Sequence, residues 1–115
     1  MTFIKNYQSL AQTPQRKIVL DLIEAAFASI QPEEVIRKNM KIASSLLQIQ
    51  NEKIDLASFK NIYLLGFGKG SAKNTQLIEE LLQNYLSDGW AIDTNEENFK
   101  KIKFTKGTHP LPSTE

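Results

Sequence analysis

Apolar residues recur at helical spacing near the start of the chain. Between residues 14 and 30 they keep intervals of three and four, the pattern of a long amphipathic helix: Ile18, Val19, Leu22, Ile23, Ala26, Phe27 and Ile30. Thr13 is a suitable N-cap and Pro14 suits the first helical position. The charged residues are expected to form a solvated face: Arg16, Lys17, Asp21 and Glu24. A short stripe in the preceding segment also fits a helix: Phe3, Ile4, Tyr7 and Leu10.

The next segment combines a weaker helix with a strand pair. Pro32, followed by Glu33 and Glu34, predicts a helix start, and a thin apolar stripe continues it: Val35, Ile36, Met40 and Ile42. Residues 46–50 and 53–59 are predicted as two short strands joined by a turn at 50–52. An alternative is that residues 55–59 form a loop that leads into the next strand.

Residues 61–71, NIYLLGFGKGS, organise the rest of the chain. Residues 62–65 predict a buried central strand, three glycines then predict a turn, and residues 71–86 return to helical spacing. A strand that passes through a glycine turn into a helix is the first half of a βαβ unit. Residues 90–93 and 102–105 predict two further strands, with a polar turn at 94–98 between them.

This order of elements predicts an α/β fold. We expect a Rossmann-like three-layer domain with a mostly parallel sheet, preceded by N-terminal helices. Four large aromatic side chains are expected in the core: Trp90, Phe27, Phe59 and Phe104.

The glycine turn is a candidate anion site. Its glycines let backbone approach a ligand, and the following helix start is expected to present unpaired N–H groups beside Lys69. The spacing is not that of a P-loop, and Ser71 replaces the third glycine of the dinucleotide fingerprint. An ordinary tight turn with a solvated lysine is the alternative. If the strand at 102–105 is parallel to the one at 62–65, His109 lies at the same sheet edge as Lys69.

Composition narrows the classes of function. The 115 residues suffice for one domain, and the formal net charge of +1 does not favour nucleic acid or a polybasic membrane anchor. There is no cysteine and one histidine, so neither a thiolate nor a histidine-rich metal site is expected. The N-terminus lacks a signal-peptide core and no segment approaches a membrane span, which favours a cytoplasmic protein.

Two motifs together make the chain similar to a known family. The turn LLGFGKGSA and the tail KGTHPLP resemble the Gly-x-Gly-Lys turn and Gly-x-His-Pro-x-Pro segment of the type 2 glycerate kinases, often labelled hydroxypyruvate reductases. The resemblance covers nearly all of the sequence, including the helix after TPQRK and the hairpin before DLASF. It implies phosphorylation of D-glycerate to 2-phosphoglycerate, with ATP and Mg²⁺.

The resemblance also assigns residues. It implies that Lys69 takes part in catalysis. It also implies that a larger set of residues binds the substrate or phosphate groups: Gly66, Gly68, Gly70, Ser71, His109 and Pro110. No residue of this chain is assigned to a metal. The chain departs from the family at Phe67 and Gly70, at the helix positions Asn74 and Thr75, and at Ser113.

The chain is also about a quarter of the length of a typical member. We therefore expect residues 1–115 to be an N-terminal fragment that lacks the second domain and is inactive alone. The alternatives are a stand-alone nucleotide- or anion-binding module and a nicotinamide-dependent hydroxypyruvate reductase. Asp93 would be the ribose-binding acid of that reductase. A fragment should expose a sheet edge and an apolar face, so the isolated chain is expected to form homodimers, to aggregate or to be of low stability.

Overall fold

The computed structural model describes residues 2–112 and 114, in two compact units. One unit comprises Met1–Val35 and the other Ile36–Glu115, so the division falls within helix α3 (Pro32–Asn39). No run of linker-like residues marks this division in the sequence.

The first unit consists of α1 (Tyr7–Leu10) and α2 (Pro14–Ser29). The predicted start of the long helix is confirmed, because Pro14 is its first residue and the Thr13 hydroxyl oxygen accepts from the Arg16 N–H at 3.3 Å. The stripe in the preceding segment forms only the single turn of α1. Among described residues no helix is long and apolar enough to cross a membrane.

Two acidic residues of α2 bind the N-terminal segment. The Glu24 carboxylate accepts from the backbone N–H groups of Phe3 and Ile4 at 2.8 and 2.7 Å, and the Tyr7 hydroxyl donates to Asp21. The interpretation of these acids as a solvated face was therefore incomplete. Burial is also less than predicted, since Leu20 is the one buried residue of α2 and Phe27, expected in the core, is 45% exposed.

The second unit begins with a three-stranded antiparallel sheet. Its strands are β1 (Met40–Ala43), β2 (Leu46–Ile49) and β3 (Glu52–Asp55), in the order β1-β2-β3. The last two confirm the predicted strand pair, but the second strand ends at Asp55 and not at residue 59. A short 3₁₀ turn, η1 (Leu56–Ser58), follows it, in agreement with the alternative that residues 55–59 leave the strand. The expectation that Met40 and Ile42 continue a helix is wrong. Helix α3 ends at Asn39, and both side chains lie on the half-buried face of β1.

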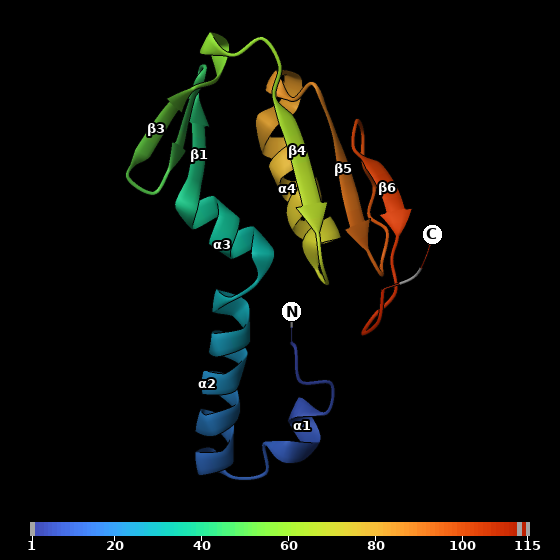
Figure 1. The fold of residues 1–115 in the computed structure, drawn as a ribbon. Helices are drawn as coiled ribbons and strands as arrows, with labels where there is room; N and C mark the ends of the chain where they lie inside the picture. Colours follow the sequence, from blue (N-terminus) through green and yellow to red (C-terminus); the bar gives the residue numbers. More distant parts are fainter. Residues whose placement is uncertain (1, 113, 115) are drawn as a thin grey trace. The chain divides into compact units, whose positions relative to one another are not determined.

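The second sheet contains three parallel strands, β4 (Tyr63–Phe67), β5 (Asp88–Asp93) and β6 (Lys103–Lys106). Helix α4 (Ser71–Leu82) and the 3₁₀ turn η2 (Gln83–Tyr85) connect β4 to β5 (Figure 1). This arrangement confirms the predicted α/β fold with a parallel sheet. The strand order is β4-β5-β6, so β5 is central in the described sheet, and not the strand predicted at 62–65.

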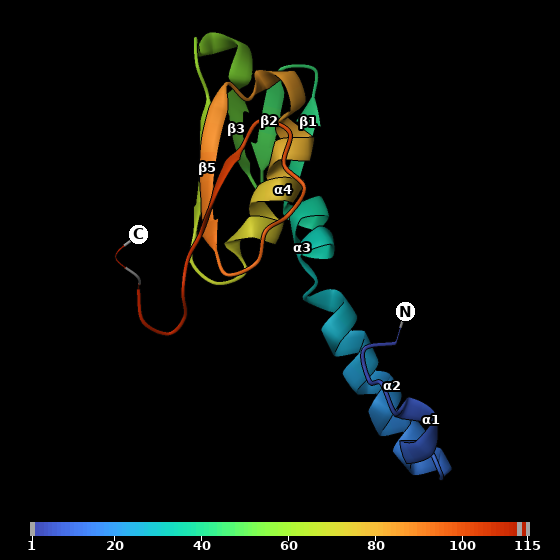
Figure 2. The same cartoon turned by 90° about the vertical axis from the view of Figure 1, so that its right-hand side faces the viewer.

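The core of the second unit lies against α4. This helix contacts β4 and β5 on one side and β1 on another, and both sheets lie beside it in Figure 2. The core residues come from both sheets, from the helical segments and from residues next to them: Leu47, Leu56, Leu82, Leu86, Ala91 and Ile102. Phe104 packs against this core as predicted, but Phe59 is 55% exposed.

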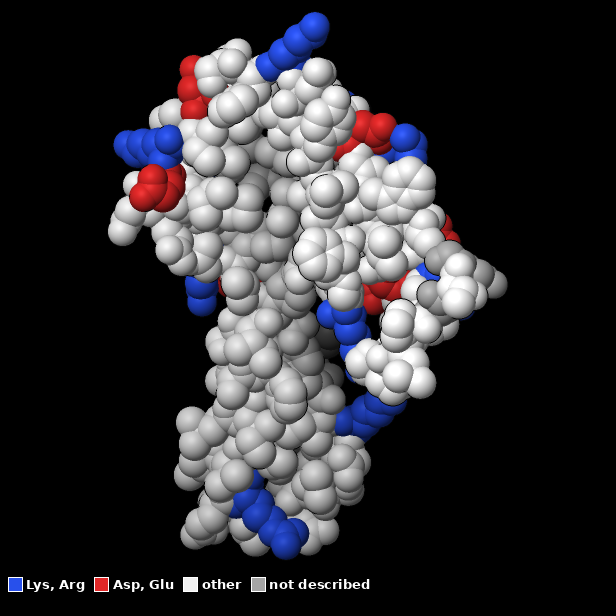
Figure 3. Space-filling model, in the orientation of Figure 1, with Lys and Arg blue, Asp and Glu red and all other residues white. Residues whose placement is uncertain are grey.

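The sheet face opposite α4 is apolar and open. Alternate residues of β4 and β5 form it: Tyr63, Leu65, Phe67, Trp90 and Ile92. Figure 3 shows this face as mostly uncharged atoms with charged groups at its margins. Trp90 belongs to it, and not to the core, with its indole N–H donating to the Thr105 hydroxyl at 2.8 Å. The predicted exposure of an apolar face is confirmed, whereas self-association stays a prediction.

Candidate functional site

A cleft lies at the carboxyl ends of the parallel strands. Its volume is about 190 Å³, and its lining comes from the segments that follow β4, β5 and β6: Gly68, Lys69, Ile92, Asp93, Thr94, Gly107, Thr108 and His109. The structure therefore brings Lys69 and His109 together, as their positions after two parallel strands predicted. Some lining residues were not predicted from the sequence, although each lies at or just after the end of a strand: Ile92, Thr94, Gly107 and Thr108.

The turn after β4 depends on two glycines with left-handed backbone. Gly68 has φ 98° and Gly70 has φ 82°, a region in which residues with a Cβ are strained. The Ser71 N–H donates to the Gly68 carbonyl at 3.0 Å, which closes the turn. Gly68 lines the cleft, whereas Gly70 is the N-cap of α4 and has no side chain to cap the helix.

A glycine is required at position 66 for a different reason, the close packing of α4 against β4. A Cβ placed there would lie 1.9 Å from the hydroxyl oxygen of Thr75, a buried residue of α4. Gly66 therefore lets α4 pack close against β4, and it does not line the cleft. Its predicted role in ligand binding stays a prediction without a contact to support it.

Asp93 caps the start of α4 from the neighbouring strand. One carboxylate oxygen accepts from the Ala72 N–H at 2.9 Å, and the other accepts from the Thr94 N–H at 2.6 Å. Burial by itself raises the pKa of Asp93, which is 5% exposed, but hydrogen bonds from the N–H groups of Ala72, Thr94 and Gly70 outweigh burial and leave this pKa below its usual value. The expectation that the helix start presents unpaired N–H groups is therefore wrong for Ala72.

Two other predicted residues lie outside the cleft lining. The Ser71 hydroxyl donates to the Ile92 carbonyl at 3.1 Å, so it ties the helix start to β5. Pro110 is exposed and follows His109 through a cis peptide bond. Neither residue contacts the cleft in the described chain, and their binding roles stay predictions.

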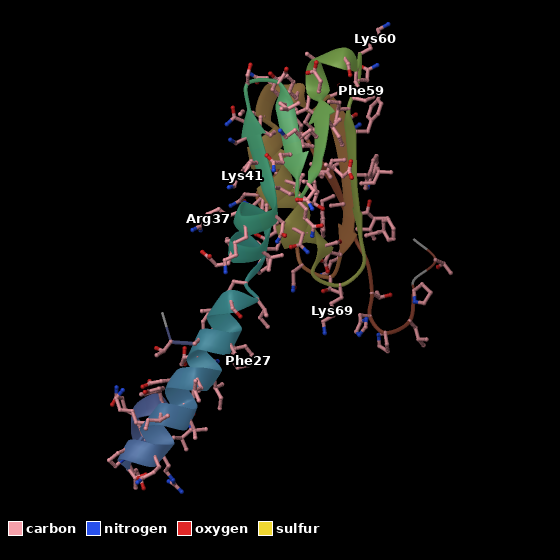
Figure 4. All side chains as sticks on the ribbon, turned by 90° about the vertical axis from the view of Figure 1, so that its left-hand side faces the viewer. Phe27, Arg37, Lys41, Phe59, Lys60 and Lys69 are labelled. Carbon is pink, nitrogen blue, oxygen red and sulfur yellow. The ribbon has the colours of Figure 1, made fainter. Side chains whose placement is uncertain are left out.

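Lys69 and His109 present their side chains to solvent. Figure 4 shows Lys69 projecting from the turn beyond the carboxyl end of β4. Neither side chain forms a hydrogen bond or ion pair with another described residue. The segment that includes His109 is held by the Gly107 N–H, which donates to the Asp93 carbonyl at 2.8 Å, and by the Thr108 hydroxyl, which donates to the Leu111 carbonyl. The cleft thus offers an exposed ammonium group and an exposed imidazole on fixed backbone.

Glu79 supports the strand that leads to His109, a role that was not predicted from the sequence. Glu79 is 3% exposed, and its carboxylate accepts from three consecutive backbone N–H groups, those of Lys100, Lys101 and Ile102, at 2.6 to 3.1 Å. Burial alone raises the pKa of Glu79, but these hydrogen bonds lower it below its usual value. Glu79 therefore anchors the segment before β6 to α4. The one feature of the sequence that pointed to this role is that Glu79 is a charged residue on the apolar side of the predicted helix.

Replacing Glu79 by glutamine should loosen residues 100–102. The variant loses a charged acceptor, so we expect a local cost of about 1–2 kcal/mol at pH 7 and correspondingly faster amide hydrogen exchange at these three residues. Because the folded pKa is lowered, the contribution of Glu79 is present above its usual pKa of 4.5 and is lost as the pH falls through the folded value. The difference in amide exchange at residues 100–102 between variant and wild type should therefore shrink as the pH falls below 4.5.

Glu80→Gln is the matched control for this change. Glu80 is the next residue of α4 and is exposed. The amides of residues 100–102 should therefore exchange at the same rate in the Glu80→Gln variant as in the wild type. Equal protection at residues 100–102 in the Glu79 and Glu80 variants would show that the carboxylate does not hold this segment.

The described residues do not supply a metal site. Within residues 2–112 and 114, no three His, Asp or Glu side chains are grouped so that they could hold an ion. The carboxylate in the cleft belongs to Asp93, and backbone N–H groups already bind it.

Comparisons with known proteins relate this chain to one family. Residues 18–115 match the model of a domain of unknown function, DUF4147. A glycerate 2-kinase of Picrophilus torridus is 27% identical over 111 residues, which cover 94% of this chain and 24% of that protein. A crystal structure of the PH0495 protein from Pyrococcus horikoshii OT3 shares the fold with a TM-score of 0.73 at 22% identity, over 88% of this chain and 23% of that one. The chain thus spans about a quarter of the length of these relatives.

Proposed function

Since this chain belongs to the DUF4147 family, which forms the N-terminal domain of glycerate 2-kinases, we propose that the protein that carries it phosphorylates D-glycerate. ATP is the proposed phosphate donor and 2-phosphoglycerate the product. The chain spans a quarter of its relatives, so this activity belongs to the longer protein and is not expected of residues 1–115 alone.

One observation supports this proposal most directly. Lys69 and His109, which belong to the two motifs that resemble the kinases, line one cleft although 40 positions separate them in sequence. Phosphoryl transfer requires positioning of the reactants and neutralisation of negative charge in the transition state. The exposed Lys69 ammonium suits that task, and we assign it contact with the transferred phosphate or the substrate carboxylate. His109 is proposed to form the opposite wall, and no proton transfer is assigned to it. Pro110 is proposed to shape the backbone that follows His109.

The proposed Mg²⁺ does not fit the donors of this chain. Asp93 contributes the carboxylate of the cleft, but that group is buried and holds backbone N–H groups. We therefore derive no step through a metal held by residues 1–115. ATP would bring phosphates to the Lys69 side of the cleft. Protein side chains that coordinate Mg²⁺ would come from outside residues 1–115.

A nicotinamide-dependent reductase is less consistent with the site. The pyrophosphate of a dinucleotide is usually held at a helix N-terminus, and an acid about 20 residues later binds the ribose. In this chain Asp93 stands at the position expected for that acid, but its carboxylate occupies the helix N-terminus. The same geometry disfavours a general anion-binding module built on the start of α4.

The decisive experiment uses the full-length protein. Incubation with ATP, Mg²⁺ and D-glycerate should yield 2-phosphoglycerate, identified by mass spectrometry and by NMR to exclude the 3-phospho isomer. Residues 1–115 purified alone should be inactive. Reduction of hydroxypyruvate with NADH, without phosphorylation of glycerate, would overturn the proposal.

A further inference from the structure

We infer that Asp93 is the positioning residue of the cleft: it joins the Lys69 turn to the His109 segment and fills the N-terminus of α4 in place of a substrate anion. This inference rests on the proposed function, because it states where the anion of that reaction binds. Asp93 contacts the segments that follow the strands on either side of β5.

The side chain of Asp93 controls the segment after β4. Gly70 provides no side-chain cap for α4, and the carboxylate of Asp93 takes that role by accepting from the Ala72 N–H at 2.9 Å. The Ser71 hydroxyl adds a second link to the same end of β5, through the Ile92 carbonyl at 3.1 Å. The backbone that follows Lys69 is therefore fixed relative to the last residues of β5.

The main chain of Asp93 controls the segment after β6. Its carbonyl accepts from the Gly107 N–H at 2.8 Å, just beyond the last residue of β6 and two positions before His109. A single residue thus contacts both segments that line the cleft. Since both contacts begin at Asp93, at the buried end of one strand, displacement of Asp93 should move the two walls together.

The carboxylate of Asp93 also determines whether an anion binds at the N-terminus of α4 or at the Lys69 ammonium. A helix N-terminus attracts anions through its unpaired N–H groups and dipole, but here a fixed negative charge already occupies that position. A substrate phosphate or carboxylate would be repelled there and would meet the exposed Lys69 ammonium instead. Asp93 therefore directs the anion to the lysine side of the cleft.

The test measures binding of inorganic phosphate to the full-length protein by calorimetry. Lys69→Met should weaken phosphate binding about tenfold, because the ammonium provides the attraction. Adding Asp93→Ala to that variant should recover about fivefold, because the N–H groups of the helix start become available. Asp88→Ala is the control in the same background. Asp88 lies at the other end of β5 and also accepts from a backbone N–H, that of Gly89, yet its removal should recover nothing.

Asp93→Asn tests the positioning role of Asp93. It also replaces Asp93→Ala in the phosphate-binding test if Asp93→Ala does not fold. The amide keeps the size of the side chain and one acceptor but removes the charge. In otherwise wild-type protein kcat should fall about tenfold, because the turn with Lys69 shifts against the His109 segment, and kcat of Asp88→Asn should be unchanged. In the Lys69→Met background Asp93→Asn should also recover phosphate binding.

Three outcomes would overturn the inference. They are wild-type kinetics for Asp93→Asn, no recovery of phosphate binding in either folded double variant, and phosphate binding that does not depend on Lys69. The calorimetric comparison remains decisive for Asp93 even if the protein does not phosphorylate glycerate. Failure of the proposed function is therefore distinguishable from failure of this inference.

Discussion

Replacing Lys69 by methionine in the full-length protein should lower kcat/KM for D-glycerate by about two to three orders of magnitude. Such a loss corresponds to about 3–4 kcal/mol of transition-state stabilisation, the usual contribution of one preorganised electrostatic donor. Methionine keeps most of the stem and removes the charge. The side chain is exposed, so the fold should be unaffected, as for most surface substitutions.

The kinetic parameters identify the role of the lysine. A fall in kcat would show that Lys69 acts on the transition state, whereas a rise in KM with constant kcat would show that it binds the ground state. Lys60→Met is a suitable control, because Lys60 is also exposed but lies near the opposite end of β4 (Figure 4). If Lys69→Met and Lys60→Met both retain wild-type kcat and KM, Lys69 is a solvated turn residue and the active-site assignment fails.

Replacing Gly66 by alanine should destabilise the second unit by about 3 kcal/mol, the upper end of the usual cost of overpacking. The new Cβ would lie 1.9 Å from the Thr75 hydroxyl oxygen and 3.2 Å from its Cβ. Thr75 is buried and β-branched within a helix, so it has few other rotamers in which to avoid the contact. Denaturant unfolding of the full-length protein, followed by a probe in this unit, would measure the loss.

A second substitution separates crowding from backbone strain. Thr75→Ala removes the hydroxyl, so the double variant should recover about 1–2 kcal/mol relative to additivity. Gly68→Ala is the matched control. No atom lies within 4 Å of a Cβ there, but the backbone has φ 98°, so Thr75→Ala should not relieve its cost. Additive behaviour of Gly66→Ala and Thr75→Ala would show that close helix–strand packing is not the reason for Gly66.

Local sequence patterns predicted the strand–turn–helix–strand order well. The run before Gly66, the helical spacing after Ser71 and the alternation near Phe104 each depend on neighbouring residues, and all three elements are present. The pattern misled at Met40 and Ile42, because an apolar pair two positions apart fits either a strand or the margin of a helix. The aromatic rings of Trp90 and Phe59 were expected in the core, but burial requires a covering element, and the described residues place none over them.

The candidate site was predictable only in part. The positions of Lys69 and His109 after parallel strands follow from chain order, so their approach could be inferred. The role of Asp93 depends on the register between β4 and β5, which places the end of β5 beside the start of α4. Glu79 likewise depends on where residues 100–102 return to the helix. Neither relation leaves a periodic signal in the sequence.

The winding order of the parallel sheet has a consequence for the position of the cleft. From β4 the chain adds β5 and then β6 in one direction, and the other edge of β4 is unpaired among the described residues. A further parallel strand at that edge would make the chain wind in opposite directions on either side of β4. The turn with Lys69 would then lie at a topological switch point, where the loops after adjacent strands diverge and ligands of open α/β sheets bind. The direction of winding, more than the glycines, would then account for an open cleft at this end of β4.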